Sequence, residues 1–207
     1  MIKSISIILC TYNEVNYIEP AINLITTTLK NVEIIIIDDN SQDGTLDKLD
    51  KLKSIYNFKL FVRKKERGFA SAVHRGFNEA TGFYVGFIDV NNYDQILQFQ
   101  NLASKLDNGY DISVLSRYVK GGGDQRILLR SLSSRIINLI SKVLLRISFN
   151  DFTSGIFLMK RNLLSKVRFV PTGHGEFFIE FMYSAYKKKF KIIEIPYIQK
   201  KDENLSK

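Results

Sequence analysis

The first half of the chain alternates continuous apolar runs with amphipathic stretches. The apolar runs predict buried strands at residues 5–9, 32–37, 58–63, 83–88 and 111–115. The amphipathic stretches between them predict helices at residues 14–29, 43–54, 68–80 and 94–106. Strands that are apolar throughout are typically buried on both faces of a sheet. The pattern therefore predicts an α/β fold of Rossmann-like type, with a mostly parallel sheet and helices on both faces.

The pattern changes after the glycine run Gly121-Gly122-Gly123. Residues 125–149 combine aliphatic and basic side chains in one segment, which contains too many charges to cross a bilayer. Two interpretations are open: a helix that packs its aliphatic face on the sheet, preferred for most of its length, or a helix that lies on an anionic membrane surface. Beyond it, the pattern predicts strands at 152–159 and 191–198 and a helix at 176–186.

Two predicted strands end in acidic residues. The second strand runs into Asp38-Asp39, followed by the turn Asp43-Gly44-Thr45, and the fourth strand ends at Asp89. Acids at strand ends often cap the next helix. Ligands of open α/β sheets, however, bind at the carboxyl ends of the strands. Two strands of one short chain that both end in acidic residues therefore indicate a shared ligand-binding site.

Composition places the chain among ordinary globular proteins. It has 207 residues, of which 45% are hydrophobic and 25% charged, and this predicts a single domain over residues 1–207. The single cysteine, Cys10, lies inside a predicted strand and favours a reducing compartment. The start of the sequence shows no signal-peptide pattern. We therefore expect a cytoplasmic location.

The net charge of +9 belongs to the second half of the chain. Residues 1–116 have a formal charge of −2, and residues 117–207 have +11. This asymmetry predicts an anionic partner, which could be nucleic acid, anionic lipid or a phosphorylated substrate.

Several motifs, taken in order, resemble family-2 inverting glycosyltransferases of the dolichyl-phosphate (polyprenyl-phosphate) mannosyltransferase type. They span residues 4–207 and are Thr11-Tyr12-Asn13-Glu14, Asp38-Asp39-Asn40-Ser41, Ala80-Thr81-Gly82, Ser116-Arg117-Tyr118, Thr153-Ser154-Gly155 and Ser206-Lys207. The resemblance implies a glycosyltransferase A-type fold. It also implies a nucleotide-sugar donor, a divalent cation (Mg²⁺ or Mn²⁺) and a polyprenyl phosphate acceptor. Residues 1–116 would form the nucleotide-sugar-binding half, and residues 117–207 the half that faces acceptor and membrane.

The same resemblance implies a set of donor and metal residues. Donor contacts are expected from Cys10, Tyr12, Glu14, Asp39, Val90, Asn91 and Lys201, and metal contacts from Asp89, Asn91 and Asp94. Relatives have Asp-x-Asp where this chain has Asp89-Val90-Asn91. Three interpretations follow: an active enzyme with a looser metal site, an active enzyme that uses Asp94, or a protein that binds the donor without turnover.

The acceptor explains why no catalytic histidine is needed. A lipid phosphate is already ionised near neutral pH, so it requires positioning and charge screening instead of a general base. Arg117, expected to be catalytic together with Asp89, would contact that phosphate, along with Arg130, Ser134 and Arg135. Arginine suits this role because its planar guanidinium binds phosphate oxygens in pairs.

The sequence thus predicts a hexosyltransferase that uses mannose from GDP-mannose, or else glucose from UDP-glucose, and that lies peripherally on the inner face of a membrane. Either residues 125–149 or a membrane-protein partner would provide the contact. A noncatalytic binder of nucleotide sugar or lipid phosphate is one alternative. A nucleic-acid-binding protein is the other. We expect no nucleic-acid partner, because no aromatic residues are interleaved with the arginines of residues 126–146 for stacking on bases.

Overall fold

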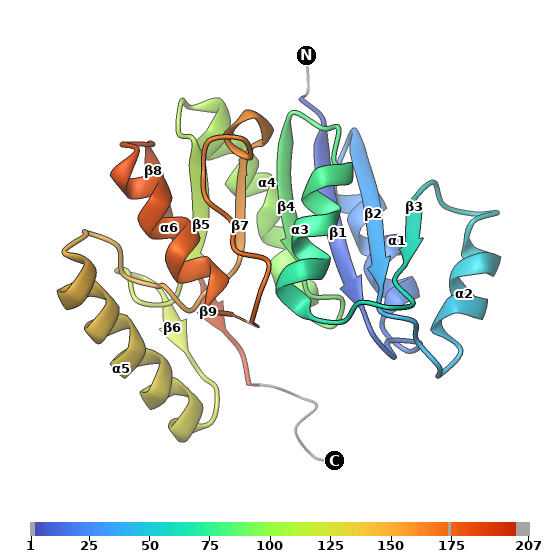
Figure 1. Ribbon diagram of the computed structural model, residues 1–207, viewed down its shortest axis with the longest axis horizontal. Coiled ribbons are helices and arrows are strands. Elements are labelled where there is room, and N and C mark those ends of the chain that lie inside the picture. Colours follow the sequence, from blue (N-terminus) through green and yellow to red (C-terminus); the bar gives the residue numbers. More distant parts are fainter. Residues whose placement is uncertain (1–2, 174, 202–207) are drawn as a thin grey trace.

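The computed structural model describes residues 3–173 and 175–201, so the Ser206-Lys207 motif lies outside the described residues. One sheet of seven strands has the order β3-β2-β1-β4-β7-β5-β8 (Figure 1). Its strands are β1 (Ile5–Thr11), β2 (Val32–Asp38), β3 (Lys59–Val62), β4 (Tyr84–Ile88), β5 (Ile112–Ser116), β7 (Phe157–Lys160) and β8 (Ile192–Pro196). Two further short strands, β6 (Gly123–Asp124) and β9 (Ile198–Gln199), pair in parallel beside it.

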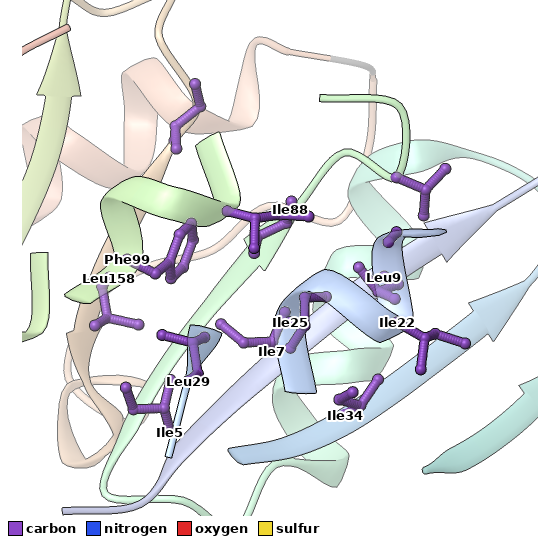
Figure 2. Packing of buried hydrophobic residues seen from close by; sticks show 14 of the residues in the cluster. Ile5, Ile7, Leu9, Ile22, Ile25, Leu29, Ile34, Ile88, Phe99 and Leu158 are labelled. Atoms are coloured by element: carbon purple, nitrogen blue, oxygen red, sulfur yellow. The ribbon is translucent and has the colours of Figure 1, made fainter. Parts of the chain in front are cut away.

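Side chains that alternate along β1 divide the core into two layers. Ile7 and Leu9 face one side of the sheet, where α1 (Ile18–Thr28), α2 (Thr45–Leu52) and α4 (Tyr93–Asp107) pack (Figure 2). Ile8 faces the other side, covered by α3 (Phe69–Glu79) and α6 (Phe177–Lys187). The predicted α/β fold, with a mostly parallel sheet covered on both faces, is confirmed.

The antiparallel strand β7 is shorter than the sequence pattern predicts. It pairs antiparallel with both β4 and β5 and begins only at Phe157, not at residue 152. Before it, the chain turns through Gly155, whose φ of +70° is readily adopted by glycine. Residues 151–155 therefore form a loop at the edge of the sheet, which the alternation of apolar residues did not reveal.

Helix α5 (Leu128–Leu145) has the opposite orientation from the one preferred on sequence grounds. Its buried residues are polar (Ser131, Ser134, Asn138 and Ser141), whereas its aliphatic side chains are exposed, up to 82% at Leu128. Figure 1 shows the helix beside β6 and α6, outside the two layers that cover the sheet. The expectation that its aliphatic face packs on the sheet was therefore wrong, because most of this face is exposed and the buried polar residues attach the helix through hydrogen bonds.

The length and composition of a helix decide whether it can cross a bilayer. Across residues 3–173 and 175–201, the structure shows no helix whose length and apolar character would let it cross a bilayer.

Candidate functional site

A pocket of about 780 Å³ opens where β1, β2 and β4 end. One wall comes from the segments that follow these strands and from the start of α3. The opposite wall comes from the loop before β7, the start of α6 and one side chain of α5. The lining residues include Cys10, Tyr12, Glu14, Asp39, Arg67, Gly68 and Asp89 on the first wall, and Ile137, Phe152, Thr153, Ser154, Gly155, Ile156 and Phe177 on the second.

Hydrogen bonds connect the loops that follow β1 and β2. The carboxylate of Asp38, which is fully buried, accepts a hydrogen bond from the Thr11 hydroxyl (2.8 Å) and another from the Ser41 amide (2.8 Å). The amide of Glu14 in turn donates to the hydroxyl of Thr45 (2.9 Å). Asp38 therefore has a structural role in shaping these loops, and its neighbour Asp39 is the one that lines the pocket.

Asp39 orders the glycine turn that begins α3. Its Oδ1 accepts a hydrogen bond from Nε of the buried Arg63 (2.6 Å), and its Oδ2 accepts one from the amide of Gly68 (3.0 Å). Arg63 also donates to the carbonyl of Gly68 (2.9 Å). Arg63 thus neutralises much of the charge of Asp39, and both side chains hold the turn at Gly68 in place beside the pocket.

Acidic side chains nevertheless lie close together on this wall. Burial raises the pKa of Glu14 to about 7, and the charges of Asp89 and Asp43 raise it further in the same direction. The guanidinium of Arg67 lies 4.8 Å from the ring centre of Tyr12 and supplies a cation at the edge of the pocket. This wall can accept a cation or hydrogen-bond donors through its acids and an anion through Arg67.

The predicted donor and metal residues separate into two groups. Cys10, Tyr12, Glu14, Asp39 and Asp89 line the pocket together.

The remaining predicted donor and metal residues lie elsewhere. Val90 is fully buried in the core, Asn91 is exposed beyond β4, and Lys201 is exposed near the end of the described chain. Asp94, in the first turn of α4, forms an ion pair with Lys200 (2.8 Å). None of these four is among the described residues that line the pocket, and no cluster of three or more His, Cys, Asp or Glu suited to a metal ion occurs in the described parts of the chain.

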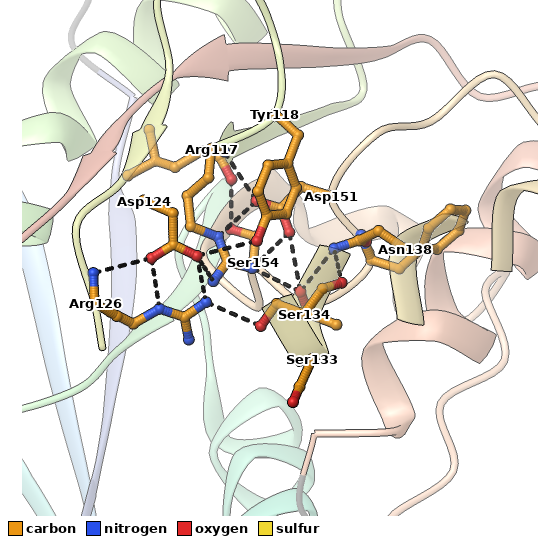
Figure 3. Close-up of polar contacts among 12 residues, drawn as sticks. Arg117, Tyr118, Asp124, Arg126, Ser133, Ser134, Asn138, Asp151 and Ser154 are labelled. Atoms are coloured by element: carbon orange, nitrogen blue, oxygen red, sulfur yellow. Dashed lines mark hydrogen bonds and ion pairs between the residues drawn. The ribbon is translucent and has the colours of Figure 1, made fainter. Parts of the chain in front are cut away.

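Arg117 lies in a buried polar network instead of at the pocket surface (Figure 3). Its Nε and one terminal nitrogen donate to the two carboxylate oxygens of Asp151 (2.8 and 2.7 Å). The same terminal nitrogen donates to the hydroxyl of Thr153 (2.6 Å). The predicted contact with an acceptor phosphate would require Arg117 to leave this paired geometry, since its side chain is only 4% exposed.

The other predicted acceptor residues lie on α5. Arg130 and Arg135 are exposed, and the guanidinium of Arg135 stands 5.4 Å from the ring centre of Tyr118. Ser134 is buried and accepts a hydrogen bond from Arg126 (2.9 Å), which also binds Asp124. Of the four predicted acceptor residues, Arg130 and Arg135 therefore lie on the outer surface, and Arg117 and Ser134 belong to the network in Figure 3.

Sequence reasoning missed the residues that complete the site. Arg67, Ile137 and Phe177 line the pocket, and Asp151 and Asn138 organise the wall behind it. Asp151, two residues before Thr153, was a usable signal, because an acid beside a polar turn needs a partner. Ile137 and Asn138 gave no signal, since their roles depend on how α5 is rotated.

A comparison with protein families identifies the chain. Residues 6–168 match the model of glycosyl transferase family 2. The chain belongs to this family. The family-2 membership expected from the motifs is thereby confirmed.

Among the relatives of this family-2 chain are two that act on lipid phosphates according to their names. A dolichol-phosphate mannosyltransferase of Pyrococcus furiosus is 34% identical over 93% of this chain, which covers 55% of that protein. A polyprenol monophosphomannose synthase of Mycolicibacterium smegmatis is 27% identical over 92% of this chain and 75% of that protein. The chain thus spans about half the length of the Pyrococcus protein.

Solved structures confirm the fold of this family-2 chain. Glucosyl-3-phosphoglycerate synthase from Mycobacterium tuberculosis, in complex with uridine diphosphate, superposes with a TM-score of 0.75 at 19% identity. The match covers 99% of this chain and 74% of that one. The same enzyme is also known with Mn²⁺ and with Mg²⁺.

Proposed function

We propose that this protein transfers a hexose from a nucleotide sugar to a polyprenyl phosphate, with GDP-mannose as the preferred donor and mannose as the sugar transferred. The observation that carries this proposal is the pocket, whose acid-lined wall stands opposite a wall connected to a helix with an exposed aliphatic face. The names of the Pyrococcus and Mycolicibacterium relatives support both the lipid acceptor and mannose.

The donor would bind along the wall formed by β1, β2 and β4. Tyr12 and Arg67 offer a flat surface with a positive charge, and Glu14 and Asp39 offer carboxylates for N–H and hydroxyl groups. Ligands of open α/β sheets bind at this edge. Bound uridine diphosphate in the Mycobacterium tuberculosis enzyme of the same fold is consistent with this placement.

A divalent cation, Mg²⁺ or Mn²⁺, fits the acids of this wall. Such cations are often held by one or two carboxylates together with substrate phosphates, so a large cluster of protein ligands is not required. Asp89 is the pocket carboxylate that we assign to it. Asn91 lies outside the pocket lining, so it would add a neutral oxygen ligand only after its side chain turned toward Asp89. When bound, the cation would neutralise charge that develops on the diphosphate leaving group.

The transfer itself requires little covalent chemistry from the protein. An oxygen of the lipid phosphate forms a bond to the anomeric carbon, while the bond to the diphosphate oxygen breaks and that oxygen keeps the electron pair. This direct displacement inverts the anomeric centre and needs no protein nucleophile. The protein's contribution is to hold the two anions in line and to exclude water from the pocket.

The acceptor would arrive from a membrane surface along α5. The helix exposes aliphatic side chains over its length and carries Arg130, Arg135 and Lys142, with no acidic residue between Leu128 and Leu145. This combination is typical of helices that lie in the interface of anionic bilayers. It supports a peripheral position on a membrane, which we assign to the inner face as the sequence led us to expect, and Arg130 and Arg135 would meet lipid phosphates there.

Removing the carboxylate of Asp89 tests the reaction. With Mn²⁺ or Mg²⁺, a short prenyl phosphate and a panel of nucleotide sugars, the wild-type protein should release GDP and form mannosylated lipid. Asp89→Ala should lower that rate by about a hundredfold or more, because charge on the leaving group is no longer neutralised. Asp50→Ala, which removes an exposed acid of α2, is the matched control.

Two outcomes would contradict the proposal. Absence of transfer with every donor in the panel would reject the enzyme and favour a noncatalytic binder. Full activity of Asp89→Ala would reject the site. Asn91→Asp, which restores the second acid of the motif, should lower the cation concentration needed for half-maximal activity.

A further inference from the structure

Helix α5 contacts the pocket loop through one side chain. Asn138 is 6% exposed, and its amide nitrogen donates to the hydroxyl of Thr153 (2.9 Å) and to the carbonyl of Ser134 (2.8 Å). Its oxygen accepts a hydrogen bond from the amide of Phe152. Both ends of the Asn138 amide are therefore used, and two of its bonds go to the loop formed by residues 151–155 (Figure 3).

That loop is also held from the sheet side. Arg117 donates to both oxygens of Asp151 and to the hydroxyl of Thr153, while its backbone amide donates to Asp151 (2.9 Å). The Thr153 hydroxyl thus accepts from Arg117 and Asn138 alike. Consequently Arg117 fixes the loop to the sheet, and Asn138 fixes the same loop to α5.

The loop is a wall of the pocket. Phe152, Thr153 and Gly155 line it opposite the acids of β1 and β4, and Ile137, the neighbour of Asn138, lines it from α5. Because α5 buries serines and an asparagine instead of aliphatic side chains, its position against this wall depends on hydrogen-bond geometry. A shift of the helix would therefore move the wall through Asn138.

We propose that Asn138 is a positioning residue that aligns the acceptor side of the pocket with α5. The proposal rests on the proposed function, in which α5 meets the bilayer and the acceptor enters beside it. When lipid fixes the helix, Asn138 fixes residues 151–155 in the geometry that receives the lipid phosphate. The donor wall, built on other strands, is independent of this contact.

The kinetic test compares Asn138→Ala with Ser133→Ala. Ser133 is exposed on the same helix, and its hydroxyl bonds the carbonyl of Leu129 within that helix, so it serves as the matched control. Asn138→Ala should raise the KM for polyprenyl phosphate by about tenfold, the equivalent of one lost buried hydrogen bond, and leave the KM for the nucleotide sugar unchanged. Ser133→Ala should change neither constant.

A second measurement does not depend on activity. Hydrogen–deuterium exchange of residues 150–156 should slow when the wild-type protein binds vesicles of phosphatidylglycerol and phosphatidylethanolamine. In Asn138→Ala this slowing should be absent, although the protein still sediments with the vesicles. Asn138→Asp keeps the volume and the acceptor oxygen but loses the donor to Thr153, and it should also lose the slowing.

The outcomes separate the two proposals. If the wild-type protein transfers no sugar, the proposed function fails, and the exchange experiment still decides the role of Asn138. If Asn138→Ala raises both KM values equally, or neither, and the vesicle-dependent slowing persists, the positioning role is overturned. Loss of slowing together with a selective effect on the lipid KM supports it.

Discussion

At the scale of single residues, the most consequential difference from expectation is the environment of Arg117. The sequence indicated a cation at the end of a strand, ready for an anionic substrate. In the structure Asp151 takes that place, and both side chains are almost fully buried. A buried arginine that is paired in this way contributes to the geometry of the site, whereas its net contribution to stability is small, because burial of both charges offsets their attraction.

Truncating Arg117 should lower the free energy of unfolding more than truncating a surface arginine does. Arg117→Ala leaves the carboxylate of Asp151 buried without its partner, which should lower the free energy of unfolding by about 3–5 kcal/mol. Arg75→Ala, which breaks an exposed pair with Glu79 within α3, should cost about 0.5 kcal/mol or less. Urea denaturation of the two variants measures the difference, and equal stabilities would contradict the buried pairing.

At the scale of elements, Glu33 on β2 connects four segments. It accepts hydrogen bonds from Ser6 on β1, from Lys59 on β3 (2.7 Å), and from the amide and hydroxyl of Thr81 (2.9 and 2.8 Å), which precedes β4. Burial alone would raise the pKa of Glu33, but the hydrogen bonds from Lys59, Ser6 and Thr81 outweigh it and lower the pKa to about 2. The charged carboxylate therefore stabilises the register of neighbouring strands.

This lowered pKa gives a defined pH dependence. The unfolded chain binds a proton at Glu33 near pH 4.5, whereas the folded protein does so near pH 2, so the stabilisation is complete above about pH 4.5 and is lost as the pH falls toward about 2. Glu33→Gln should lower stability by about 1 kcal/mol at pH 7, because one of the two acceptor oxygens becomes an amide nitrogen and the charge that strengthens the remaining hydrogen bonds is lost. Urea unfolding from pH 7 to 3 should show the two proteins converging, and a constant difference would contradict the assignment.

The elements also show how far the sequence could be read. Every strand of the first half was predicted, because β1, β2 and β4 are mostly apolar and mostly buried. The orientation of α5 was not predictable from periodicity, since a pattern of aliphatic and polar faces does not say which face meets protein. Its Ser134 needed Arg126 as a partner and its Asn138 needed Thr153, and these residues are brought together only by the fold.

At the scale of the whole molecule, the candidate site was predictable on one side only. Glu14, Asp39 and Asp89 follow strands that lie next to one another in a parallel sheet, so their convergence followed from topology. The opposite wall depends on the antiparallel strand β7 and on the loop before it. Such contacts join residues far apart in sequence and leave no local pattern.

The uneven charge of the molecule predicts salt-sensitive binding to membranes. Vesicles that contain phosphatidylglycerol should bind the protein more tightly than neutral phosphatidylcholine vesicles, and added salt should weaken that preference, because the screening length falls from about 10 Å at 0.1 M to about 3 Å at 1 M. Replacing Leu128, Leu132 and Leu139 by serine should abolish sedimentation with either kind of vesicle, with little loss of stability, because all three are exposed. Binding that persists in this variant would exclude the outer face of α5 as the contact.

With the proposed membrane contact, the polar attachment of α5 would also set the orientation of the whole protein on a bilayer. The buried hydrogen bonds that Asn138 donates and Ser134 accepts can form at one rotation of the helix about its own axis, whereas an apolar contact would tolerate several. A helix that lies flat in the headgroup layer would therefore hold the sheet at one tilt and the pocket mouth at one height above the lipid. An acceptor phosphate at a fixed depth in the bilayer would then lie level with the sugar in the pocket.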